Sequence, residues 1–136
     1  NIADTILIID MLHHVEKNDQ EKLLNNIKTK LTKKGKIIFF EYTFSNHKDP
    51  VLKTEMLSQF MQLTLEQRFG CMSIMDWIGN ILINRSQTPM PYSYRTLEDW
   101  EKFYIELGFK IIKSQFIGFT ENFFHPGPYG LLILKK

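Results

Sequence analysis

The stretch that decides the fold is Thr5-Ile6-Leu7-Ile8-Ile9-Asp10. Residues 5–9 are all β-branched or aliphatic, without the polar alternation of a strand that has one face in water. Runs of this kind are typical of strands in parallel sheets, where helices cover both faces. We therefore predict a strand covered on both faces that ends at Asp10.

An amphipathic helix is predicted to follow this strand. Asn18 and Glu21 form a capping-box pattern. Apolar residues then recur at helical spacing, namely Leu23, Leu24, Ile27 and Leu31. Three lysines crowd the expected last turn, and Gly35 is placed to take the left-handed conformation that ends a helix. A second apolar run, residues 37–40, closes at Glu41, so this part predicts one right-handed strand–helix–strand unit.

The middle of the chain predicts helices. Residues 50–84 carry apolar side chains at helical spacing with Gly70 as a break, which predicts two successive helices. Residues 85–94 contain two prolines and predict a loop. Thr96 is placed as the N-cap of a further helix that ends at Gly108.

The last part predicts two strands joined by a turn. Residues 109–119 are strand-like, the Pro126-Gly127-Pro128 cluster turns the chain, and residues 130–134 form a last apolar strand. This connection is too short and too rich in proline for a crossover helix, so the pair is predicted to be antiparallel. The predicted fold class is α/β.

Composition bounds the class of protein. A length of 136 residues and a mass of 16.2 kDa predict a single domain, residues 1–136. No apolar run approaches the roughly 20 residues that span a bilayer, and scattered charges summing to +2 give no case for nucleic acid. A lone cysteine, Cys71, and the absence of a leader pattern predict a cytoplasmic protein. Because the chain opens on Asn1 close to a strand-like run, we expect a fragment of a larger protein.

Polar residues follow the two predicted strands at their carboxyl ends, where ligands bind in open α/β sheets. Asp10 and Glu41 end these strands, and two imidazoles, His13 and His14, follow Asp10. A histidine beside a carboxylate can act as a general base. The alternative is that these residues are helix caps or structural histidines. Adjacent histidines are expected to point in different directions, so no metal site is predicted.

Other candidate residues are weaker. Tyr92, Tyr94 and Arg95 could reach across the carboxyl edge of the sheet, or they could simply pack on their neighbours. Cys71 has no flanking histidine or basic pair and is expected in the core rather than as a nucleophile. No Gly-rich phosphate-binding loop is present, which removes the main support for kinases and dehydrogenases.

The order of these elements resembles the later half of a class I S-adenosylmethionine-dependent methyltransferase. Residues 3–15 (Ala-Asp-Thr-Ile-Leu-Ile-Ile-Asp-Met-Leu-His-His-Val) resemble that family's fourth strand and the Leu-His-His that often follows it. Residues 31–38 resemble the helix end, glycine turn and fifth strand. Residues 94–100 with residues 107–109 are similar to the last crossover helix and its exit into strand six, and residues 128–136 to the reversed seventh strand.

This resemblance implies a partial Rossmann-like methyltransferase sheet, strands four to seven, with flanking helices and an antiparallel last strand. Residues 45–95 correspond to an inserted helical segment that shapes the acceptor pocket. The implied activity is S-adenosylmethionine-dependent methyl transfer to an oxygen or nitrogen of a small molecule. We expect His14 to act as the base and Asp10 to orient it.

The resemblance also distributes binding roles. Asp10, Met11 and Leu12 would lie beside the cofactor. The residues expected on the acceptor side are His13, Glu41, Tyr42, Tyr94 and Arg95.

One departure from the family pattern limits these expectations. The Gly-rich loop and the acidic residue that hold the methionine part and the ribose of the cofactor are not in this sequence. Half of the cofactor site is therefore missing, and we expect the chain alone to be inactive and to bind cofactor weakly or not at all. The alternative function is a non-catalytic remnant or interaction module. Its open sheet edge would be covered by a second copy, a partner or a missing N-terminal half.

Overall fold

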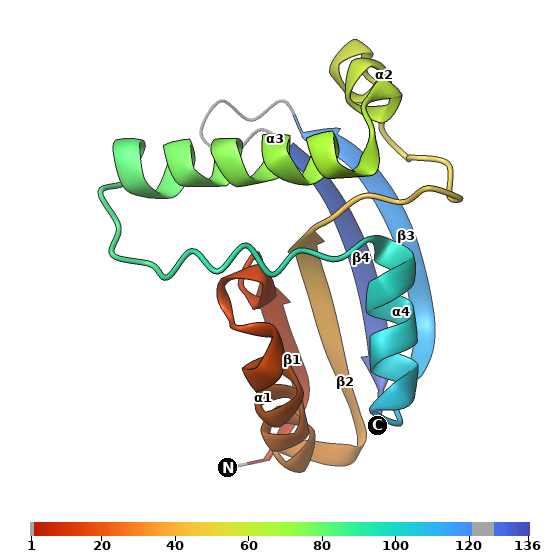
Figure 1. Ribbon diagram of the computed structural model, residues 1–136. Helices are drawn as coiled ribbons and strands as arrows, with labels where there is room; N and C mark the ends of the chain where they lie inside the picture. The colour runs from red at the N-terminus through yellow and green to blue at the C-terminus, as the bar shows by residue number, and fades with distance from the viewer. Residues whose placement is uncertain (1, 121–126) are drawn as a thin grey trace.

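A four-stranded sheet carries the fold, with strand order β1-β2-β4-β3 (Figure 1). The parallel pair is β1 (Ala3–Ile9) and β2 (Leu31–Tyr42). β4 (Gly127–Lys135) runs antiparallel to both β2 and β3 (Lys110–Thr120). The predicted α/β class with an antiparallel last strand is confirmed.

This structure is a computed structural model, and it describes residues 2–120 and 127–136. Pro126, one member of the predicted turn, lies outside these residues. Gly127 and Pro128 are the first residues of β4 rather than part of a turn, because they pair with the end of β3. The prediction of a turn at these two residues was therefore wrong.

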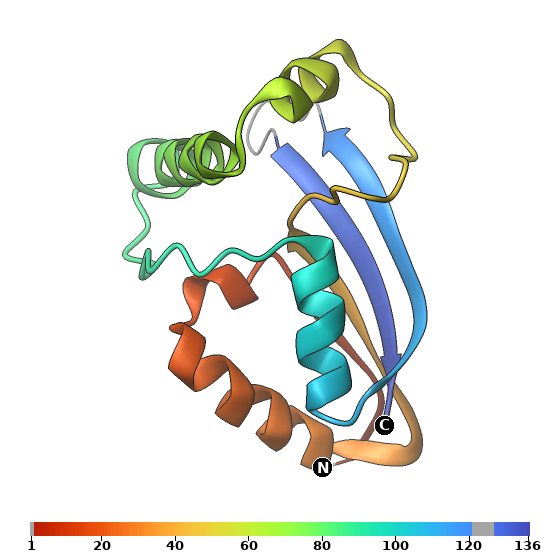
Figure 2. The ribbon, with the colours of Figure 1, turned by 45° about the vertical axis from the view of Figure 1, so that its right-hand side comes forward.

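Helices lie on one face of the sheet and across one end of it. Their bounds are η1 (a 3₁₀ turn, Leu12–His14), α1 (Lys17–Thr29), α2 (Glu55–Gln62), α3 (Leu65–Trp77), η2 (a π-helical segment, Ile78–Ile83) and α4 (Leu97–Glu106). α1 and α4 lie on the same face of the sheet (Figure 2), and α3 crosses beyond the carboxyl ends of β1 and β2 (Figure 1). Among the described residues, no helix is both long enough and apolar enough to cross a membrane.

The core lies between the sheet and the two helices on its face. Leu24 of α1, Phe39 of β2 and Trp100 of α4 are all fully buried. On β1, however, Leu7 and Ile9 are 57% and 56% exposed. The prediction that this strand is covered on both faces was wrong, because α1 and α4 both pack on the same side.

The helix α1 starts and ends earlier than predicted. Its N-cap is Glu16, which makes no side-chain capping hydrogen bond, and Asn18 lies inside the first turn. Leu31 already belongs to β2, because the parallel ladder pairs it with Ala3 of β1. Pairing with β1 thus ends the helix, and Gly35 is a strand residue rather than a helix cap.

The break between α2 and α3 lies at Leu63 and Thr64, not at Gly70. Thr64 and Gln67 form a complete capping box, which starts α3. Gly70 therefore lies within α3. The predicted cap of α4 is confirmed, because the Thr96 side chain accepts a hydrogen bond from the Asp99 N–H.

Gly118 is expected to tolerate no side chain. Its φ is +106°, and a Cβ atom there would lie 2.3 Å from the carbonyl oxygen of Leu52. We predict that Gly118→Ala lowers the free energy of unfolding by about 1–3 kcal/mol, measured by urea denaturation. The matched control is Gly70→Ala, where nothing lies within 4 Å, and this change should stabilise α3 by about 0.5–1 kcal/mol. Equal effects of the two substitutions would contradict this account.

Candidate functional site

The chain leaves β1 by a sharp turn that carries the two histidines. Asp10 takes a left-handed conformation with φ of 49°, and its N–H donates to Phe40 of the neighbouring strand (2.8 Å). Asp tolerates this conformation better than most residues. The 3₁₀ turn η1 follows at once, so His13 and His14 lie directly beyond the carboxyl end of β1.

A buried carboxylate, Glu41 at the end of β2, organises this turn. Its side chain is fully buried, and Oε2 accepts a hydrogen bond from the Leu12 N–H at 3.0 Å. Its Oε1 lies 2.5 Å from Nδ1 of His13. Glu41 therefore holds both the backbone of η1 and one ring nitrogen of His13.

Other contacts fix the position of His13. The fully buried Gln20 of α1 donates to the Leu12 carbonyl at 2.9 Å. The carbonyl of His13 itself accepts from the Ser93 N–H at 3.0 Å. The Tyr94 ring stacks on the imidazole with a centroid distance of 5.2 Å. Glu41 and Tyr94 thus contact the side chain of His13, while Gln20 and Ser93 hold the backbone at Leu12 and His13.

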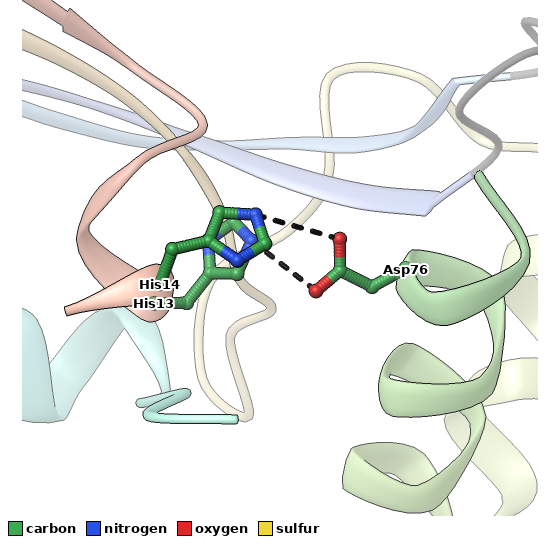
Figure 3. Close-up of side chains that lie close together, drawn as sticks. All are labelled: His13, His14 and Asp76. Atoms are coloured by element: carbon green, nitrogen blue, oxygen red, sulfur yellow. Dashed lines mark ion pairs between the residues drawn. The ribbon is translucent and has the colours of Figure 1, made fainter. Parts of the chain in front are cut away.

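Asp76, near the end of α3, faces both histidines (Figure 3). Its Oδ2 lies 3.5 Å from Nε2 of His13, and its Oδ1 lies 3.7 Å from Nε2 of His14. Tyr94 donates its hydroxyl to Oδ2 at 2.8 Å, and Asn80 donates to Oδ1 at 2.7 Å. The carboxylate is thus oriented by two neutral donors and directed at the imidazole pair.

The two imidazoles lie side by side, with ring centroids 4.1 Å apart. The expectation that adjacent histidines diverge was wrong, because the tight 3₁₀ turn and the contact with Asp76 bring both Nε2 atoms to one side (Figure 3). His14 is the more exposed ring, with 12% of its side chain accessible against 1% for His13. Its Nδ1 lies 3.0 Å from the Pro89 carbonyl oxygen, which can only accept a hydrogen bond.

The electrostatic environments of the two rings differ. Burial alone would lower the pKa of His13, but the carboxylates of Asp76, Glu41 and Asp10 raise it to about 10. Burial and the neighbouring His13 lower the pKa of His14, and Asp76 opposes this only in part. The surroundings therefore favour a cationic His13 and a neutral His14.

The other acidic groups of the site respond to the same surroundings. Burial raises the pKa of Asp10 to about 6, and His13 opposes the rise. Burial would also raise the pKa of Asp76, but hydrogen bonding and the charge of His13 lower it. Tyr129 of β4 donates its hydroxyl to Oδ2 of Asp10 at 3.2 Å. These contacts join β1, β2, β4 and α3 in one buried polar cluster.

Most, but not all, of the residues predicted for the site lie together. Asp10, His13, His14, Glu41 and Tyr94 belong to the cluster, and the Tyr42 ring lies beside His13 with a centroid distance of 5.9 Å. Arg95, which was predicted to contact the substrate, contacts residues outside this cluster. Arg95 donates to Oε1 of Gln20, and its guanidinium lies over Phe103 at 4.4 Å.

The predicted partner of Asp10 was His14, but the described contact of its carboxylate with a histidine is with His13. Oδ1 of Asp10 is 3.9 Å from Nδ1 of His13, and Oδ2 of Asp10 accepts the hydrogen bond from Tyr129. The ring nitrogens of His14 contact Pro89 and Asp76 instead. Orientation of His14 by Asp10 stays a prediction.

Sequence reasoning missed Asp76 and Tyr129. Asp76 is the only charged residue between Arg68 and Arg85, in an otherwise apolar helical stretch. An isolated charge of this kind is costly to bury without partners, and this was the available signal. Tyr129 lies in a strand-like run, and nothing local to it indicates contact with β1.

The residues predicted for the cofactor fit that role to different degrees. Asp10 Oδ1 is buried and has no hydrogen-bond partner among the described residues, and Met11 beside it is partly exposed. Contact of these two residues with the cofactor stays a prediction. Leu12 does not fit through its side chain, which is fully buried in the core, and its N–H already donates to Glu41.

Comparison with known proteins identifies the fold. The chain is 28% identical over 121 residues to a flavonoid 4'-O-methyltransferase of Glycine max, covering 86% of this chain and 28% of that protein. Among solved structures it is similar to mitomycin 7-O-methyltransferase MmcR, with a TM-score of 0.55, 13% identity, and coverage of 100% of this chain and 30% of the other. A putative O-methyltransferase of Nostoc punctiforme PCC 73102 gives a TM-score of 0.55, 21% identity, and coverage of 100% and 32%.

These comparisons confirm the predicted resemblance to class I S-adenosylmethionine-dependent methyltransferases and the predicted partial methyltransferase sheet. The chain spans about 28% of the curated relative that it matches. No family model matches the sequence.

Proposed function

We propose that the whole protein carrying this chain transfers a methyl group from S-adenosylmethionine to an oxygen atom of a small molecule. The names of the three similar proteins support an oxygen acceptor, since each is an O-methyltransferase. S-adenosylmethionine, when bound, supplies an electrophilic methyl group on a positively charged sulfur. The residues of this chain position the acceptor and accept its proton.

One observation supports a role in proton transfer above the others. His13 has Nδ1 held by Glu41, while its Nε2 is buried and makes no hydrogen bond to any residue in the described part of the chain. A carboxylate on Nδ1 fixes the tautomer and ring orientation and stabilises the imidazolium formed when Nε2 takes a proton. Because its raised pKa favours the imidazolium, His13 can act as the proton acceptor only in its neutral form, and the fraction of this form grows as the pH rises.

The proposed reaction transfers one methyl group to the acceptor and one proton away from it. As the acceptor oxygen forms its bond to the methyl carbon, the bond from that carbon to sulfur breaks and sulfur keeps the electron pair. The hydroxyl proton of the acceptor passes to Nε2 of His13, and Glu41 stabilises the resulting charge. Alignment of the acceptor oxygen with the methyl group makes the largest contribution, and removal of the proton adds to it.

His14, the base predicted from the sequence, is the alternative proton acceptor. Its Nδ1–H donates to Pro89, which leaves the Nε2 lone pair directed toward Asp76. Asp76 faces both rings, but on the Nδ1 side the backbone carbonyl of Pro89 carries no charge to stabilise an imidazolium, whereas Glu41 carries one beside His13. We therefore favour His13, and matched variants of the two residues distinguish the roles.

Residues 45–95 support a role in forming the acceptor pocket. Asp76 and Tyr94 both come from this segment and contact the histidine pair. The side chains of Ser73, Ile74, Trp77 and Tyr92 line a mostly apolar hollow on the same segment. An apolar hollow on the segment that also carries Asp76 suits an aromatic acceptor that carries a hydroxyl group.

The buried cluster also argues against a non-catalytic remnant. His13, Glu41 and Asp76 are almost fully buried. Burying ionisable groups costs stability, and apolar residues of similar size would often be better tolerated. A sheet retained only to bind a partner would have no need of this cluster.

The negative charge of Glu41 can be removed with little change to the shape of the site. Glu41→Gln keeps the shape and an oxygen that can accept the Leu12 N–H, but it cannot stabilise a charged His13. In the whole protein we expect turnover to fall by about 10- to 100-fold, with cofactor affinity nearly unchanged. The measurement is transfer of labelled methyl from S-adenosylmethionine to a panel of phenols and amines.

The control is Glu101→Gln on α4, which changes the same group outside the histidine cluster, where its partner is Lys48. Its turnover should match that of the wild type. Labelling of amines but not phenols would refute the oxygen acceptor. Absence of transfer to any acceptor, with S-adenosylmethionine bound, would favour the non-catalytic alternative.

A further inference from the structure

The ring nitrogens and the carboxylate shown in Figure 3 have the composition and spacing of a metal site. Nε2 of His13, Nε2 of His14 and a carboxylate oxygen of Asp76 lie within 4.8 Å of one another. Nε2 of His13 lies 3.5 Å from Oδ2 of Asp76, and Nε2 of His14 lies 3.7 Å from Oδ1, the other oxygen of the same carboxylate. Around a tetrahedral zinc ion with bonds of about 2.0–2.2 Å, neighbouring ligand atoms lie roughly 3.4 Å apart. Small side-chain shifts would therefore seat an ion among these atoms.

The surroundings of each group match those of metal ligands. His13 Nδ1 is held by the Glu41 carboxylate, and His14 Nδ1 by the Pro89 carbonyl. In the neutral form of each ring, these contacts place the proton on Nδ1 and the lone pair on Nε2, which is the usual arrangement of zinc-binding histidines. Asp76 is itself oriented by hydrogen bonds from Tyr94 and Asn80.

A second observation points to a ligand at this place. Nε2 of His13 is a buried atom on a side chain that is only 1% exposed; Asp76 Oδ2 lies 3.5 Å away, at ion-pair distance, but Nε2 makes no hydrogen bond to the described residues. Buried nitrogen atoms without a hydrogen bond are rare in proteins, because losing the hydrogen bond to water costs free energy. A metal ion coordinated by Nε2 would satisfy it.

We propose that His13, His14 and Asp76 bind a divalent transition-metal ion of the zinc type through three protein ligands, leaving one coordination position open. Two imidazoles and one carboxylate suit zinc better than calcium or magnesium, which prefer oxygen ligands. The inference does not depend on methyl transfer, because binding is measured without turnover. Zinc and a proton would compete for Nε2 of His13, so zinc is expected to inhibit a protein that uses this atom as a base.

The experiment titrates the chelator-treated whole protein with zinc chloride by calorimetry and, separately, with cobalt chloride by visible absorption. We expect one zinc ion per chain and the intense bands of four-coordinate cobalt. Asp76→Asn and His14→Gln should each weaken zinc binding by at least about 100-fold. Circular dichroism of each variant checks that the fold is kept, and Asp76→Asn is the primary variant because it preserves size and shape.

Two matched controls separate this site from incidental binding. His47→Gln makes the same substitution at an exposed histidine, and Cys71→Ser removes the cysteine. Both should bind zinc as the wild type does. Absence of stoichiometric binding, or binding that survives in Asp76→Asn and is lost in either control, would overturn the proposal. Tight zinc binding without inhibition of methyl transfer would support the metal site and instead refute His13 as the base.

Discussion

Replacing His13 by Gln in the whole protein is expected to lower turnover by about 10²- to 10⁴-fold while leaving affinity for S-adenosylhomocysteine nearly unchanged. Gln can still donate a hydrogen bond to Glu41, but it cannot take a proton from the acceptor. A loss of this size corresponds to about 3–5 kcal/mol of transition-state stabilisation. The measurements are steady-state methyl transfer and calorimetry with the cofactor product.

His14→Gln is the matched comparison for this variant. It makes the same change at the neighbouring residue, whose ring contacts Pro89 and Asp76 rather than Glu41. We expect a smaller loss, below about 10-fold, since this ring is not assigned the proton. If His14→Gln were the more damaging change, the role of base would pass to His14, as the sequence analysis predicted.

The largest expected effect on stability is that of Trp100→Ala. Trp100 is fully buried on α4, and its ring stacks on Tyr104 with a centroid distance of 5.6 Å. Removing the ring would leave a cavity between α4 and the sheet, and such truncations cost about 3–5 kcal/mol. Urea denaturation followed by circular dichroism measures the loss.

A substitution on the same helix controls for helix propensity. Ile105 is 60% exposed, so Ile105→Ala should change the free energy of unfolding by less than about 0.5 kcal/mol. Comparable losses in the two variants would show that α4 does not anchor the core. A loss confined to Trp100→Ala would show that burial of this ring against the sheet holds the helix in place.

The sequence predicted those parts of the fold that are set by local chemistry. The run at residues 5–9 and the run at residues 37–40 are strands, and they pair in parallel as expected. Thr96 and Gly108 bound α4 because capping depends on a few neighbouring residues. Where a pairing partner far along the chain decided the outcome, as for Leu31 and Ala3, local reasoning placed the helix end wrongly.

The site was predictable to the same extent. Asp10 and Glu41 could be placed together because parallel neighbouring strands end at one edge. The part played by Asp76 could not be predicted, because it depends on how α3 crosses that edge, and the sequence between β2 and α3 carries no signal for that path. The same limit applies to Tyr129, which reaches Asp10 only through the order of the strands in the sheet.

The two outer edges of the sheet, formed by β1 and β3, differ in how well other segments cover them, and this difference affects aggregation. Val51 and Leu52 donate their N–H groups to Phe116 and Ile117 (3.0 and 2.7 Å), so the segment after β2 shields part of the outer edge of β3. Within residues 2–120 and 127–136, the outer edge of β1 pairs with nothing, and two large aliphatic side chains beside it are exposed. Aggregation of the isolated chain in concentrated solution should therefore begin at β1, and a charged residue introduced there would suppress it.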